Sequence, residues 1–68
     1  MLSIGIVTVS DRAAAGLYPD AGGPAVAAWL RRVVVSPWRP VARLVADERE
    51  RIEAVLRDLA DGEGCGLI

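Results

Sequence analysis

The chain has 68 residues, of which 53% are hydrophobic, and eight basic residues against nine acidic ones leave a formal net charge of −1. This balance excludes a polybasic nucleic-acid-binding arm and an acidic disordered tail. The longest apolar run is far shorter than the roughly 20 residues that cross a bilayer, and no basic region precedes the first apolar stretch. With a single cysteine and no intrachain disulfide, we expect a cytoplasmic protein without nucleic-acid or membrane partners.

Two residue types that carry much of enzyme chemistry are absent, namely histidine and lysine. Without histidine the chain supplies no imidazole base, no Ser-His-Asp triad and no histidine-ligated metal. Without lysine it supplies no Walker A lysine and no Schiff base. Any chemistry must therefore use carboxylates, arginines, hydroxyls, backbone N–H groups or a hard metal ion.

The first half of the chain predicts a buried strand, a loop and a helix. Ser3–Val9 is short, β-branched and nearly all apolar, as in a strand buried on both faces. Ser10–Gly23 is polar and contains glycine, which indicates a loop, and Pro24 suits the first turn of a helix. That helix ends before Pro37. Its core-facing stripe, with a tryptophan as anchor, comprises Val26, Trp29, Leu30, Val33 and Val34.

The second half repeats this order. Val41–Val45 predicts a strand, and Asp47 followed by Glu50 matches the N-cap and capping-box pattern of a helix. Gly62–Gly64 ends that helix, and Cys65–Ile68 resembles the start of a third strand. The apolar stripe of the second helix comprises Ile52, Val55, Leu56 and Leu59.

The order β-α-β-α-β predicts an α/β fold with a parallel sheet, right-handed crossovers and three layers. A third strand of four residues has no following helix to cover it. We therefore expect residues 1–68 to be the N-terminal portion of a single larger domain, truncated in or after the third strand. The alternative is a very small three-stranded domain.

Candidate site residues follow the two strands, because ligands of parallel α/β sheets bind at the carboxyl ends of the strands. Ser10, Asp11 and Arg12 follow the first strand, and Asp47 follows the second. Two carboxylates without a nearby histidine suit Mg²⁺, and Arg12 suits a phosphate oxygen.

Each of these residues also has a purely structural interpretation. Asp47 is an N-cap on sequence alone, Ser10 and Asp11 are common loop residues that bond their own backbone, and Arg12 is an ordinary solvated arginine. A receiver-like domain that uses Asp11 for metal is a further alternative from the pattern. From the residues alone, these alternatives stay open.

Three segments together resemble the start of a known family. They are Ile4–Tyr18, Asp20–Ala25 followed by Trp29 and Leu30, and Leu44–Glu48 followed by Ile52. This combination resembles the molybdopterin adenylyltransferases (MogA-type) of molybdenum cofactor biosynthesis. The resemblance implies a molybdopterin-binding domain whose third strand continues into a Thr-Gly-rich loop and a second essential aspartate, both beyond residue 68.

The resemblance also implies roles for individual residues. Asp47 corresponds to a catalytic aspartate, here preceded by Ala46 where the family usually has proline, and we infer that it is also a metal ligand. Gly22 stands where family members often have serine. The residues that would line or close over the substrate and nucleotide site are Ser10, Asp11, Arg12, Asp20, Gly22 and Gly23.

The implied reaction is transfer of AMP from ATP to the phosphate of molybdopterin, assisted by Mg²⁺, in an enzyme that is typically a homotrimer. Two alternatives share the same residues. One is a non-catalytic pterin-binding or oligomeric relative, and the other is an inert truncated fragment. We expect the 68 residues alone to be inactive, because half of the phosphate-binding apparatus lies outside them.

Overall fold

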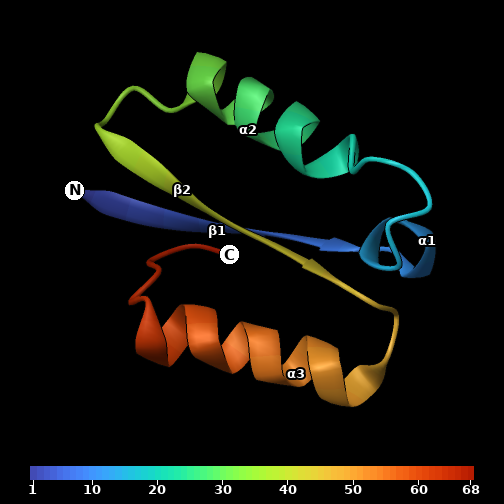
Figure 1. Cartoon of the computed structure of the whole chain (residues 1–68). Helices are drawn as coiled ribbons and strands as arrows, with labels where there is room; N and C mark the ends of the chain where they lie inside the picture. Colours follow the sequence, from blue (N-terminus) through green and yellow to red (C-terminus); the bar gives the residue numbers. More distant parts are fainter.

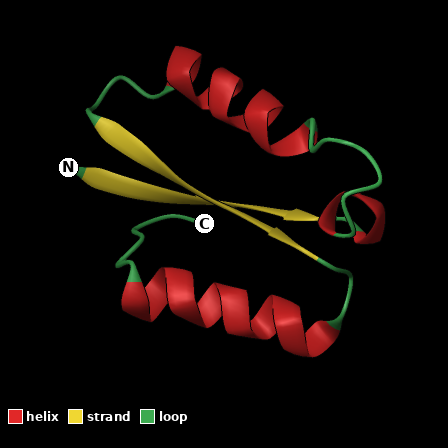
Figure 2. Cartoon of the chain, in the orientation of Figure 1, coloured by secondary structure: helices red, strands yellow, loops and turns green.

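The computed structural model describes all 68 residues, and two parallel strands lie between helices on both sides (Figure 1). Figure 2 shows one helix above the sheet and another below it, so the order of layers is α/β/α. The predicted α/β class with parallel strands is confirmed. In chain order the elements are β1 (Leu2–Val9), α1 (Asp11–Ala14), α2 (Gly22–Val33), β2 (Trp38–Val45), α3 (Arg49–Arg57) and the π-helical turn η1 (Asp58–Gly62).

The two strands pair along their full length, from Leu2 opposite Trp38 to Val9 opposite Val45. β2 therefore starts three residues before the predicted strand at Val41, and it includes Pro40. Proline has no N–H for a ladder bond, and it is tolerated here because β2 is the outer strand of the sheet. The connection through α2 covers one face, as expected of a βαβ unit.

The predicted third strand is present as a single parallel bridge between Ile4 and Leu67. The Gly5 N–H donates to the Leu67 carbonyl at 2.7 Å, and the Gly66 N–H donates to the Ser3 carbonyl at 3.0 Å. These bonds lie on the edge of β1 opposite β2. β1 is therefore the central strand of the described structure.

The core lies on both faces of β1. Leu59, in η1 directly after α3, is fully buried and packs against Gly5, where an added Cβ would lie 3.1 Å from Leu59 Cδ1. The absence of a side chain at Gly5 therefore lets η1 approach the sheet closely. The other buried hydrophobic residues are Ile4, Ile6, Ala13, Val41 and Val45.

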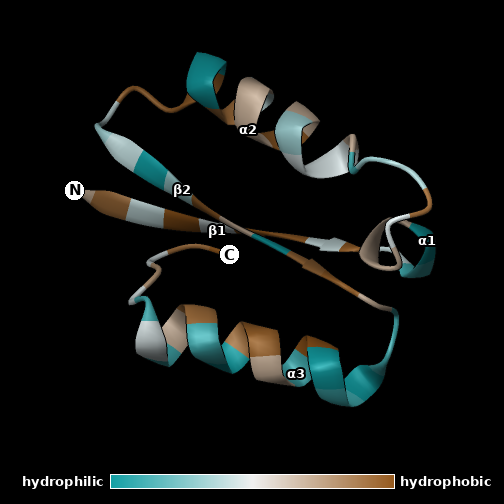
Figure 3. Cartoon of the chain, in the orientation of Figure 1, coloured by the Kyte–Doolittle hydropathy of each residue, from teal (hydrophilic) through white to brown (hydrophobic).

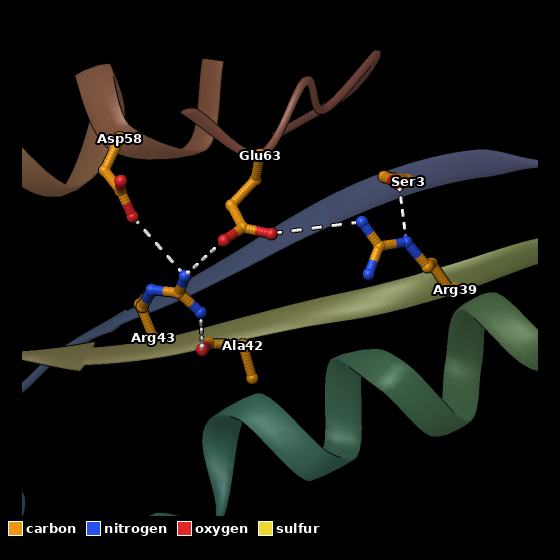
Figure 4. Close-up of polar contacts among 6 residues, drawn as sticks. All are labelled: Ser3, Arg39, Ala42, Arg43, Asp58 and Glu63. Atoms are coloured by element: carbon orange, nitrogen blue, oxygen red, sulfur yellow. Dashed lines mark hydrogen bonds and ion pairs between the residues drawn. The ribbon is translucent and has the colours of Figure 1, made fainter. Parts of the chain in front are cut away.

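A polar cluster joins β2 to the turn after α3 (Figure 4). Arg43 Nη2 lies 3.4 Å from both Asp58 Oδ2 and Glu63 Oε1. Arg39 Nη2 lies 3.9 Å from Glu63 Oε2, and Arg39 Nε donates to Ser3 Oγ at 2.9 Å. Isolated exposed pairs stabilise by about 0–1 kcal/mol, but here one carboxylate contacts both arginines. The cluster thus connects β2 to the segment through which the chain returns to β1.

α2 is covered by the sheet over only part of its apolar stripe. Val26, Trp29 and Val33 are 47%, 54% and 49% exposed, so the prediction that Trp29 anchors the core is wrong. Part of the stripe lies beside the edge of β1 that faces Leu67 and Ile68. The C-terminal segment covers this edge with only the single bridge between Ile4 and Leu67. A cavity of about 310 Å³ lies there, lined by Ile4, Gly5, Ile6, Val7, Val26, Leu30, Leu67 and Ile68.

Figure 3 colours the chain by hydropathy and shows where its hydrophobic residues lie relative to the sheet. On α3 the hydrophobic residues face the sheet, and the C-terminal segment is hydrophobic where it passes beside β1. Leu67 and Ile68 remain 53% and 48% exposed. No helix of the structure combines the length and apolar character needed to cross a membrane.

The exposed apolar edge predicts that the 68-residue chain associates with itself in solution, since such edges favour edge-to-edge pairing. Sedimentation velocity over a hundredfold range of concentration should show a rising sedimentation coefficient. Trp29→Glu should weaken this association, whereas the control Leu17→Glu, at a residue 73% exposed on the loop after α1, should not. A parental chain that stays monomeric throughout would contradict the prediction.

Candidate functional site

The two strands end side by side at one edge of the sheet, where α1 and the start of α3 also lie (Figure 1). The Ser10 N–H donates to the Val45 carbonyl at 2.9 Å and so continues the ladder past β1. Ser10 Oγ then accepts a bond from the Ala13 N–H at 3.2 Å. This cap starts α1 within the segment that was predicted to be a loop. The hydroxyl of Ser10 is therefore used for capping.

Asp11 and Asp47 are brought together, as the topology predicted. Asp11 Oδ1 accepts a hydrogen bond of 2.7 Å from the backbone N–H of Asp47, across 36 positions of sequence. The carboxylate of Asp47 is exposed and forms no hydrogen bond or ion pair within the chain. The site thus contains one engaged carboxylate and one that is available to a ligand.

The N-cap interpretation of Asp47 is wrong. α3 begins at Arg49, its N-cap residue is Glu48, and no side chain caps it. Glu48 instead pairs with Arg51 Nε at 2.8 Å, and Glu50 forms no capping box. The first helical bond runs from the Ile52 N–H to the Glu48 carbonyl at 3.0 Å, which places Asp47 one residue before the N-cap, and the Asp47 N–H bonds to Asp11.

Arg12 lies on α1 and is exposed, and its guanidinium forms no hydrogen bond or ion pair with the rest of the chain. Solvated arginines are common on protein surfaces, so exposure alone assigns no role. The structure shows where Arg12 lies relative to the two aspartates. Arg12 follows Asp11 directly, at the edge of the sheet where Asp47 also lies.

A second group of candidate residues forms the start of α2. Asp20 Oδ1 accepts bonds from the N–H groups of Gly22 at 3.1 Å and Gly23 at 3.2 Å. Asp20 therefore caps the helix, although the residue directly before the helix, Ala21, has no capping bond.

Gly23 lies in a closely packed position. A Cβ there would lie 2.8 Å from Asp20 Oδ2 and 3.0 Å from Thr8 Oγ1. Sequence reasoning missed Thr8. The strand alternation was an available signal, because Thr8 is two residues from Ile6 and so shares its face of β1.

The largest cavity, about 490 Å³, lies between α2 and the sheet beside this capping loop. Asp20 and Gly23 line one end of it together with Thr8. The full lining comprises Ile6, Thr8, Asp20, Gly23, Pro24, Ala27, Arg31, Pro40, Ala42, Arg43 and Leu44. Asp20 and Gly23, at the start of α2, and Thr8, on β1, therefore form the part of the cavity wall where the helix meets the strand.

The two glycines of this loop should respond differently to alanine. Gly23→Ala should lower the free energy of unfolding by about 1–3 kcal/mol, because the methyl group overpacks against Asp20 and Thr8. Gly22→Ala meets only ordinary contacts, at 3.7 Å and longer, and should leave stability unchanged or raise it by up to about 1 kcal/mol. Urea denaturation measures both variants. Equal effects at the two positions would refute the packing argument.

Known proteins similar to this chain share one name. No family model matches the chain. A molybdopterin adenylyltransferase of Haemophilus influenzae is 47% identical over 68 residues, which are 100% of this chain and 34% of that protein. The molybdopterin adenylyltransferases of Escherichia coli K12 and Helicobacter pylori are 42% and 36% identical over 67 residues. Those matches cover 98% of this chain and 34% and 38% of the relatives.

The resemblance to the molybdopterin adenylyltransferases is confirmed. The chain spans about a third of the length of the curated relatives it matches, and the matched part is their N-terminal portion. Every candidate residue lies within the match, because the Haemophilus influenzae relative covers 100% of the chain. The roles of the individual residues in a molybdopterin adenylyltransferase stay predictions.

Proposed function

We propose that these residues belong to a molybdopterin adenylyltransferase of molybdenum cofactor biosynthesis, which transfers AMP from ATP to the terminal phosphate of molybdopterin and releases pyrophosphate. Residues 1–68 are then the N-terminal portion of its single molybdopterin-binding domain, in the cytoplasm. The observation that carries the proposal is the continuous match to relatives of that name, at up to 47% identity across the chain. The arrangement at the carboxyl ends of β1 and β2 also supports the proposal, because the carboxylate of Asp47 there forms no hydrogen bond or ion pair with another residue of the chain.

This reaction suits a chain without histidine. The attacking phosphate oxygen is already an anion near neutral pH, so no strong general base is needed. The obstacle is the repulsion between the attacking anion and the triphosphate. Groups that neutralise this charge stabilise the transition state, and Arg12 together with nearby backbone N–H groups fits that task.

Mg²⁺ fits the donors that this chain supplies. No three acidic, histidine or cysteine side chains gather to form a closed metal site. Mg²⁺ usually binds through one or two carboxylates plus substrate phosphates, and the free carboxylate of Asp47 supplies such a ligand. When bound, the ion would offset negative charge on the phosphates. In this role Asp47 would hold the ion and would accept no proton.

The substrates proposed are ATP and molybdopterin, the full protein is proposed to be a homotrimer, and neither nucleic acid nor membrane is a partner. A pterin-binding relative without transferase activity would present the same residues. An inert fragment would fold similarly and bind neither substrate. Turnover, and not binding alone, therefore tests the proposal.

A chimera makes turnover measurable. These 68 residues replace the 68 residues that they match in the Haemophilus influenzae relative, at 47% identity. The parental chimera should form the AMP adduct of molybdopterin from ATP. A folded chimera that binds both substrates without turnover would favour the non-catalytic binding alternative.

In that chimera, Asp47→Asn and Asp47→Ala should each lower kcat/KM for AMP transfer by at least about 100-fold, or about 2.7 kcal/mol of transition-state stabilisation. Both should melt within about 2 °C of the parental protein, because the carboxylate caps no helix. Asp61→Asn is the matched control, since this exposed carboxylate on η1 also has no partner. Parental turnover by Asp47→Asn would remove Asp47 from the catalytic site.

A further inference from the structure

The hydrogen-bond ladder between β1 and β2 is completed by a side chain at its last step. Extending the register by one residue places Ser10 opposite Ala46. In a parallel pair the bond after Ser10 N–H to the Val45 carbonyl joins the Asp47 N–H to the Ser10 carbonyl. The Ser10 carbonyl instead accepts from the Ala14 N–H at 3.0 Å, because the chain turns into α1.

The Asp47 N–H is consequently left without its ladder partner, and Asp11 Oδ1 takes the place of that carbonyl. The distance of 2.7 Å lies within the usual range of an N–H···O hydrogen bond, like the 2.9 Å of the preceding ladder bond. The bond fixes the backbone of Asp47 and leaves its carboxylate free. No other side chain of the structure contacts this N–H.

We propose that Asp11 is a positioning residue, which holds the main chain of Asp47 so that its carboxylate projects toward the reacting phosphates. This inference rests on the proposed adenylyl transfer, and it revises the expectation that Asp11 lines the substrate site as a ligand. A ligand of a cation needs a negative charge. A residue that replaces a backbone carbonyl needs only an acceptor oxygen, which asparagine also has.

The test compares Asp11→Ala with Asp11→Asn in the chimera defined above. Asp11→Ala should lower kcat roughly 10- to 100-fold, because displacement of a catalytic group by about 1 Å costs that much, while KM for ATP changes less than about threefold. Asp11→Asn should recover activity to within about threefold of the parental chimera. Equal losses in both variants, or no loss in Asp11→Ala, would overturn the proposal.

Hydrogen exchange at the Asp47 amide, followed by NMR in the same three proteins, supplies a readout that does not depend on turnover. The amide should be protected in the parental and Asp11→Asn chimeras and should exchange at least about tenfold faster in Asp11→Ala. Protection that is unchanged in Asp11→Ala would also overturn the proposal. If the parental chimera transfers no AMP, the proposed function fails, and the exchange rates still decide whether Asp11 holds Asp47.

Discussion

The parallel pairing of β1 with β2 is the constraint on which the rest of the structure depends. Its register, from Leu2 opposite Trp38 to Val9 opposite Val45, makes both strands end at the same edge of the sheet. Residues that follow the strands therefore meet although they lie 36 positions apart in sequence. A shift by one residue would turn the apolar side chains of a strand to the opposite face and separate the two ends. Burial of apolar side chains on both faces of the sheet thus sets the register, and the register brings the candidate site residues together.

The two helices hold this pairing from opposite sides by different means. On one face Leu59 packs into the space above Gly5, and Arg43 bonds to carboxylates of the turn after α3. On the other face Gly23 sits against Asp20 and Thr8, where an added Cβ would lie 2.8 Å and 3.0 Å from their side-chain oxygens. Close packing at two glycines, together with one polar cluster, therefore connects the helical segments to both faces of the sheet.

The sequence was sufficient for the order of the elements, the parallel sheet and the meeting of Asp11 with Asp47. These follow from apolar periodicity and from the topology of βαβ units, which are local or general rules. The sequence did not predict the short helix α1, because the capping residue Ser10 is also a residue type that is common in loops. Trp29 was misplaced because periodicity shows which face is apolar and not how much of that face a neighbour covers.

Asp47 shows most clearly why local patterns fail at a site. Aspartate followed three residues later by glutamate is the usual start of a helix, yet α3 begins at Arg49 with Glu48 as its N-cap residue, and the Asp47 N–H bonds to Asp11. The contact of the Asp47 N–H with Asp11 joins residues 36 positions apart, so no local pattern reveals it. The same contact leaves a carboxylate free, which is the property that the proposed chemistry needs.

The account is tested most directly by a crystal structure of the chimera with a non-hydrolysable ATP analogue. It predicts that Asp11 Oδ1 accepts the N–H of Asp47 and that the carboxylate of Asp47 faces the nucleotide phosphates. The account would be contradicted if the Asp11 carboxylate faced the phosphates instead, or if the Asp47 N–H bonded to the carbonyl of Ser10.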